Sequence, residues 1–126
     1  MNMRFLWLIP LALIVGLIVW NWNWSVAPEN VVGTYVNTNY DNPHCCVEAP
    51  HQPDTLVLLS NGVMHSGFYG TGTWELRYNN TEIHWSYPYE HGMAGYAAGV
   101  VNEIGTELRL ELNYKTNHYY RKIRGL

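Results

Sequence analysis

The segment 42–51 holds the residues best suited to chemistry, because it carries both cysteines and two of the six histidines. Two thiolates and two imidazoles suit zinc or copper, the ligand set here being His44, Cys45, Cys46 and His51. The spacing is poor for such a site, since adjacent cysteines point in different directions along an extended chain and no Cys-x-x-Cys is present. We therefore expect no metal, and a disulfide between Cys45 and Cys46 in an oxidising compartment. Free thiols and intermolecular pairing are the alternatives.

The tyrosines are the second group of interest, and all ten lie after residue 27. They exceed what the core of one small barrel needs, so some should reach the surface or line a pocket. Tyrosine is common in interfaces because it buries area at low entropy cost. The equal alternative is ordinary packing at the ends of a barrel. The binding candidates are Tyr87, Tyr89, Tyr96, Tyr119 and Tyr120.

Motifs for catalysis are absent from the sequence. No Gly-rich phosphate loop, His-Glu-x-x-His or Gly-x-Ser-x-Gly occurs, and the remaining histidines are scattered. We expect no catalytic residues and no cofactor. The formal net charge of -3 also argues against nucleic acid as a partner, because such binders carry a basic face.

The N-terminal part of the chain is strongly apolar. No charged residue lies between Arg4 and Glu29, and residues 5–24 give 20 uncharged positions, about the 30 Å of a bilayer core when helical. We expect residues 1–27 to be a transmembrane signal-anchor that contacts lipid through residues 5–24, with interfacial tryptophans at its end. Arg4 places the N-terminus in the cytoplasm, and so residues 28–126 outside it, in the periplasm of a Gram-negative cell. The alternative is a cleaved signal peptide, which proline at position 28 disfavours.

Residues 73–86 predict a β-hairpin with one buried face. Its flanks alternate apolar and polar residues around Asn79-Asn80, and asparagine tolerates the positive φ of a tight hairpin turn. One register brings apolar residues together on one face and opposite charges together on the other. The pairs expected are Trp74 with Trp85, Leu76 with Ile83, Arg77 with Glu82 and Glu75 with His84.

Further strands are expected throughout residues 28–126. A Ser60-Asn61-Gly62 loop sets Leu58 opposite Met64, and a first strand is expected over residues 31–36. Leucines alternate over 106–112, a closing strand covers 118–123, and the Ala/Gly-rich stretch 93–101 fits either a strand or a flexible flap. No helix is expected after Trp24. The fold class is all-β, with about seven or eight antiparallel strands forming an up-and-down barrel or a sandwich.

Three short patterns carry a resemblance to a family. Gly33-Thr34-Tyr35, Leu56-x-Leu58 before Asn61-Gly62, and Gly72-x-Trp74-x-Leu76 resemble small bacterial membrane-anchored lipocalin-like barrel domains. Tyr35 stands where the lipocalin Gly-x-Trp signature has tryptophan. The resemblance covers residues 31–123 and implies a fold, with no ligand or activity carried over.

These observations favour a non-enzymatic interaction module held at a membrane, such as an accessory subunit or an immunity or inhibitor protein with a protein partner. A carrier of a small apolar ligand in the barrel is the alternative. A Cys/His metal-handling protein is the third. A barrel filled by side chains favours the first, and an open apolar cavity favours the second.

Overall fold

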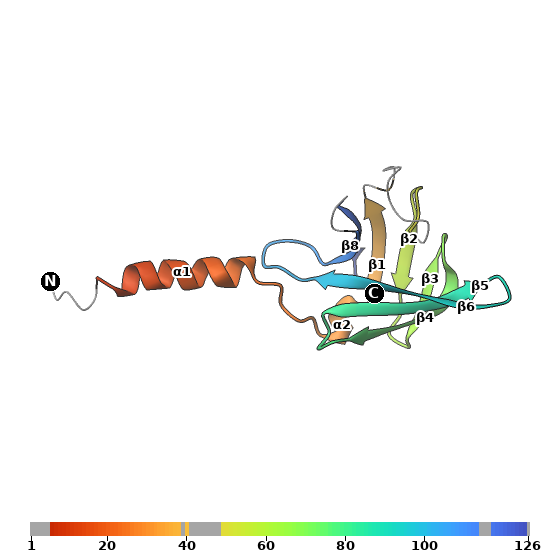
Figure 1. Cartoon of the computed structure of the whole chain (residues 1–126), viewed down its shortest axis with the longest axis horizontal. Helices are drawn as coiled ribbons and strands as arrows, with labels where there is room; N and C mark the ends of the chain where they lie inside the picture. Colours follow the sequence, from red (N-terminus) through yellow and green to blue (C-terminus); the bar gives the residue numbers. More distant parts are fainter. Residues whose placement is uncertain (1–5, 39, 41–48, 114–116, 126) are drawn as a thin grey trace.

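The computed structural model describes residues 6–38, 40, 49–113 and 117–125. Along them the chain forms two helices and eight strands (Figure 1). The helices are α1 (Leu8–Asn21) and α2 (Pro28–Val31). The strands are β1 (Gly33–Thr38), β2 (Thr55–Leu58), β3 (Val63–Ser66), β4 (Gly70–Arg77), β5 (Glu82–Tyr89), β6 (Gly92–Val101), β7 (Arg109–Asn113) and β8 (His118–Arg124).

The eight strands close into a barrel in sequence order. Each strand is antiparallel to the next, and β8 closes the barrel by pairing with β1. This confirms the all-β, up-and-down prediction and excludes the sandwich. We call the end at which β1, β3, β5 and β7 finish the pocket end. We call the opposite end, where α2 and the linker from α1 arrive, the helix end.

The register of the predicted hairpins is confirmed. Trp74 lies opposite Trp85 between β4 and β5, and Leu58 lies opposite Met64 between β2 and β3. Gly62 takes the left-handed backbone conformation, with φ of 85°. The ambiguous stretch 93–101 is a strand, since it belongs to β6, which pairs with β5 up to Gly99 and with β7 from Gly99 to Val101. Alternation of apolar and polar residues therefore specified which face of each strand turns inward.

Large side chains fill the barrel interior. The aliphatic residues Leu56, Leu58, Met64, Ile83 and Leu110 are buried, as are several aromatic rings. Trp85 stacks on Tyr96, with ring centroids 5.4 Å apart and planes 14° apart. These residues sit at every second position of their strands, so the inward faces pack into one continuous core.

Helix α1 corrects the prediction of a transmembrane helix over residues 5–24. It has 14 residues, so it is about 21 Å long, against about 30 Å for a bilayer core. The backbone leaves the helix at Trp22, which has extended φ and ψ of -76° and 136°. Within the part of the chain that the structure describes, no helix is both long enough and apolar enough to cross a membrane. The predicted membrane-spanning anchor is therefore wrong.

The linker after α1 is extended because its backbone and side chains bond to the barrel. The Asn23 side-chain amide donates to the Val100 carbonyl at 2.9 Å, and its oxygen accepts from the Asn102 N–H at 2.6 Å. The Trp24 N–H donates to the Asn102 carbonyl at 2.9 Å. We call these three bonds the Asn23–Asn102 clasp. They replace the hydrogen bonds that a continued helix would have made.

The short helix α2 corrects the prediction that no helix follows Trp24 and that the first strand begins at residue 31. Proline at its first position has the φ of a helix and needs no hydrogen-bond partner for its nitrogen. Val31 ends this helix, is fully buried, and its carbonyl accepts a bond of 2.5 Å from the Tyr35 hydroxyl. Strand β1 therefore starts two residues later than predicted, and α2 covers the helix end of the barrel.

Candidate functional site

Asp54 is the centre of a hydrogen-bond network at the pocket end. It directly precedes β2, and its side chain is buried. Its Oδ2 accepts bonds of 2.6 Å from both the Ser66 hydroxyl and the Tyr120 hydroxyl. Its Oδ1 accepts the Phe68 N–H at 3.0 Å. One carboxylate therefore joins the start of β2 to the end of β3, the β3–β4 turn and β8.

Asn37 fixes the backbone of the segment that carries Asp54. Its side-chain oxygen accepts the Asp54 N–H at 2.7 Å, and its amide donates to the Gln52 carbonyl at 2.7 Å. The Asn37 N–H also donates to the Asp54 carbonyl at 3.3 Å. Asn37 is itself buried in β1, so the Asp54 carboxylate is held from a rigid strand.

A surface pocket of about 530 Å³ lies beside this network. It is lined by Ala49, Pro50, His51, Gln52, Pro53, Asp54, Gly67 and Phe68. Its walls are the segment before β2 and the β3–β4 turn, which Asp54 holds together. The pocket is therefore at the end of the barrel, outside the packed interior.

His118 contributes a buried imidazole to the same end. It begins β8 and is fully buried, with its ring centroid 6.2 Å from that of His51. Burial lowers the pKa of His118, and the nearby His51 lowers it further, against a smaller raising effect of the Pro50 backbone. The structure thus favours neutral His118. By contrast, burial and then the bond and charge of Asp54 raise the pKa of Tyr120, which keeps its hydroxyl protonated as a donor.

The five tyrosine candidates are distributed over different environments. Tyr87 and Tyr120 are buried in the core, and Tyr96 is half-buried against Trp85. Tyr119 lies on the other face of β8, with the Arg109 guanidinium 5.3 Å from its ring centroid. Tyr89 is 60% exposed near the tip of the β5–β6 hairpin. Most of the candidates thus pack within the barrel, and Tyr89 is the one most open to a partner.

Tyr69 is a central residue that the sequence analysis missed. It belongs to the β3–β4 turn yet is buried, with ring centroids 4.8 Å from Tyr87 and 5.4 Å from Trp85. Its ring and that of neighbouring Phe68 pack nearly perpendicular to each other, with centroids 4.8 Å apart. Tyr69 therefore closes the pocket end from inside. A turn residue bounded by glycines gives no periodic signal of burial, so its role was not readable from sequence.

Exposed apolar side chains occur on two hairpins at the pocket end. Phe68 in the β3–β4 turn is 47% exposed, and Met93 in β6 is 65% exposed. With Tyr89 they place apolar surface on the two hairpins that finish at this end. Contiguous exposed apolar patches mark interaction sites, so these three residues are candidates for contact with a partner.

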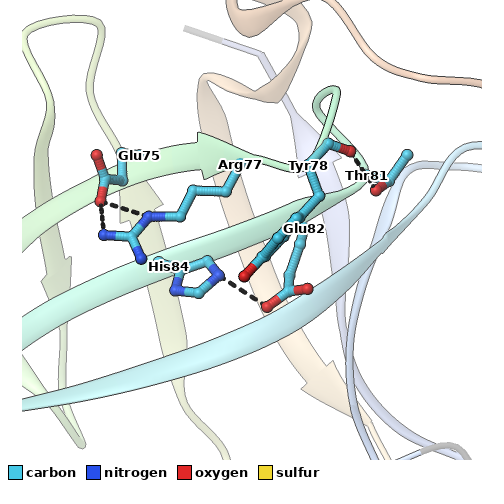
Figure 2. A network of polar contacts seen from close by, with 6 residues as sticks. All are labelled: Glu75, Arg77, Tyr78, Thr81, Glu82 and His84. Atoms are coloured by element: carbon cyan, nitrogen blue, oxygen red, sulfur yellow. Dashed lines mark hydrogen bonds and ion pairs between the residues drawn. The ribbon is translucent and has the colours of Figure 1, made fainter.

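The charged residues on the outer face of β4 and β5 follow the predicted register but pair differently. Arg77 lies opposite Glu82 and Glu75 lies opposite His84. Figure 2 shows that the ion pairs run along each strand: Arg77 contacts Glu75, and His84 contacts Glu82 at 2.7 Å. Side chains two residues apart share a face of a strand, so long side chains can reach along it as well as across it. All four are at least partly exposed, which makes this network a solvated surface.

The predicted Cys/His chemistry falls largely outside the described residues. His44, Cys45 and Cys46 are not among them, so the disulfide and the alternative metal site stay predictions. The Nδ1 atom of His51 is 3.1 Å from the Tyr40 carbonyl, a bond that requires its proton on Nδ1. Among the described residues, no group of three or more His, Cys, Asp or Glu side chains is arranged to hold a metal.

The comparisons with known proteins give no family. No protein-family model, curated protein or solved structure matches this chain. Chemically, the pocket end offers a carboxylate already bonded to three donors, a neutral histidine and exposed aromatic surface. The exposed aromatic surface can contact a partner, whereas the buried carboxylate and histidine can only hold that surface in place.

Proposed function

We propose that this protein is a non-enzymatic interaction module that associates with lipid through α1 and binds a protein partner at the pocket end. The carrying observation is the exposed apolar surface of α1. Its described side chains are uncharged and mostly exposed, and the helix projects away from the barrel (Figure 1). A helix that is apolar on every face needs an apolar environment. The proposal concerns contact with lipid and does not require the helix to cross a bilayer.

The filled interior supports a binding module over a carrier of a small apolar ligand. Inward-facing Trp85, Tyr35, Tyr120 and Leu56 occupy the space that a ligand in the barrel would need. The barrel is lipocalin-like in strand number and order. We propose a relationship to lipocalin-like domains from this architecture together with the short sequence patterns. Accessory subunits and inhibitor or immunity proteins are concrete forms of such a module.

The lipid contact is tested by flotation of the full-length chain with phosphatidylcholine vesicles. We expect the wild-type chain to float with the vesicles, and the double variant Leu13→Glu with Leu17→Glu to stay in the bottom fraction of the gradient. Withdrawing a leucine from contact with lipid loses up to about 1.5–3 kcal/mol of apolar burial, which is roughly tenfold or more in affinity per residue. Met93→Glu is the matched control, because it charges an equally exposed apolar residue at the far end of the barrel. Equal flotation of the helix variant and the wild type contradicts the proposal.

The protein contact is tested in native membranes with a photo-crosslinking amino acid at position 89. We expect one discrete crosslinked species, and its loss when Phe68→Glu is added, because both positions belong to the pocket end. The same crosslinker at exposed Ile123, on β8 near the helix end, is the control and should give no such species. Identical products from the two positions would argue against a specific surface at the pocket end.

A further inference from the structure

We propose that the helix end of the barrel is a second lipid-contact surface, with Ile104 in the β6–β7 loop at its centre. Helix and barrel then meet a lipid surface as one rigid body. The inference rests on the proposed lipid contact of α1 and adds the orientation of the barrel to it. The pocket end is thereby turned away from the lipid.

Ile104 is an apolar side chain held at the tip of a tight loop. It is 44% exposed, and the next residue, Gly105, has φ of 84°. The Thr106 hydroxyl and N–H donate to the Glu103 carbonyl at 3.2 and 3.4 Å, which closes the turn around Ile104. The hydrogen bonds of the turn therefore hold the isoleucine side chain toward solvent, where it does not contribute to the barrel core.

The loop adjoins the tryptophan-rich exit of α1. A Cβ added to Gly105 would lie 3.4 Å from the ring of Trp20, so the loop backbone lies next to that ring. Trp22 and Trp24 follow, both exposed, with ring centroids 6.4 Å apart. Tryptophan favours the boundary between lipid and water, because its ring is apolar and its N–H is polar. The apolar surface of α1 thus continues onto the β6–β7 loop.

The Asn23–Asn102 clasp holds this surface in one geometry. The three bonds join the linker to the end of β6 and to the first residue of the loop. With the clasp closed, the loop cannot turn away from a surface that α1 occupies. The Asn23 side chain makes two of the three bonds, so one substitution removes most of the clasp and leaves the bond from the Trp24 N–H to the Asn102 carbonyl.

Charge on the loop favours an uncharged or zwitterionic lipid surface as the occupant. Glu103 lies 3.9 Å from Arg109, and Glu107 lies 3.8 Å from Arg121. Each acidic group of the loop therefore has a basic partner on β7 or β8, which leaves isoleucine and the tryptophans as the distinctive surface. A second copy of the chain would need a complementary apolar pocket at this end, whereas lipid needs none.

The test measures the affinity of the full-length chain for phosphatidylcholine vesicles. We expect Ile104→Glu to weaken binding about tenfold, the effect of withdrawing one buried isoleucine, and Ile104→Ser to weaken it less. Met93→Glu, at the pocket end, should bind like wild type. Vesicles with anionic lipid should give the same order of variants.

The clasp supplies a second, independent measurement. Asn23→Ala removes two of the three clasp bonds and loosens the barrel from α1, so Ile104→Glu should weaken binding less in the Asn23→Ala background than in the wild type. Wild-type affinity in Ile104→Glu, together with loss of binding in Leu13→Glu with Leu17→Glu, overturns the inference and leaves the proposed function standing. No loss in either variant overturns both. A change in self-association with unchanged vesicle binding assigns Ile104 to a second copy and overturns the lipid surface.

Discussion

Replacing Asp54 by asparagine tests how far one carboxylate holds the pocket end together. The wild-type side chain accepts from Ser66, Tyr120 and the Phe68 N–H. An amide keeps one acceptor oxygen and puts an NH₂ group where the other oxygen was. In either orientation that NH₂ faces at least one donor, and the Tyr120 hydroxyl has no access to water because Tyr120 is fully buried.

The expected loss follows from the strength of these bonds. Bonds to a charged group contribute about 1.5–3 kcal/mol each, and Asp54→Asn removes one or two of them. We expect the free energy of unfolding to fall by about 2–5 kcal/mol, a large part of the total for a domain of this size. Tyr120→Phe should cost about 1.5–3 kcal/mol, and the two changes together should cost less than their sum, because Asp54→Asn removes or, by losing the charge, weakens the bond that Tyr120→Phe removes.

The assay is urea unfolding of the full chain in mild detergent, and tryptophan fluorescence reports the fraction unfolded. Glu75→Gln is the matched control, since it makes the same chemical change on the exposed outer face of β4. It should cost less than about 1 kcal/mol, as exposed ion pairs contribute little. Equal midpoints for Asp54→Asn and Glu75→Gln would refute the reasoning, as would additive losses for Asp54→Asn and Tyr120→Phe.

Three further predictions concern the barrel. Gly72→Ala should destabilise by about 1–3 kcal/mol or more, because its Cβ would overlap the Ser86 carbonyl oxygen. Gly95→Ala meets only an ordinary contact at 3.7 Å and should change stability in urea little. Trp85→Ala should cost about 3–5 kcal/mol in the same assay, and a loss below 1 kcal/mol would mean that the core is wrongly assigned. Since the pKa of His118 is lowered in the folded state, its contribution to stability is complete above about pH 6.5 and is lost as pH falls below that value. His118→Gln should therefore reduce the pH dependence of the melting temperature below pH 6.5. An unchanged pH dependence would contradict this.

The sequence predicted the barrel where the signals were local. Alternation on both sides of Asn79-Asn80 and the glycine at position 62 determined two hairpin registers, because turn geometry and one buried face allow only one pairing. The length of α1 was not readable in this way. Its Asn-Trp tail carries no charge, so hydropathy alone does not distinguish a continued helix from a linker bonded to Asn102.

The candidate site was mostly beyond prediction for a physical reason. Its bonds join residues far apart in sequence, such as Asp54 with Tyr120, and neither residue type nor neighbouring positions signal the pairing. The tyrosines at 87, 96 and 120 were singled out by their abundance, but burial was decided by strand register. The predicted charge pairs failed in detail because arginine is long enough to reach a carboxylate along its own strand.

Closure of the barrel by β1 and β8 has a consequence for synthesis of the chain. All the other pairings join strands that are consecutive in sequence, so seven hairpin contacts can form as the polypeptide emerges. Strand β1 keeps one open edge until β8 has left the ribosome, because Asn37 of β1 pairs with Tyr120 of β8. An open edge is a template for wrong pairing. A nascent chain stalled before His118 would therefore carry two unpaired edges and an uncovered apolar interior, which makes the last strand the one on which solubility during translation depends.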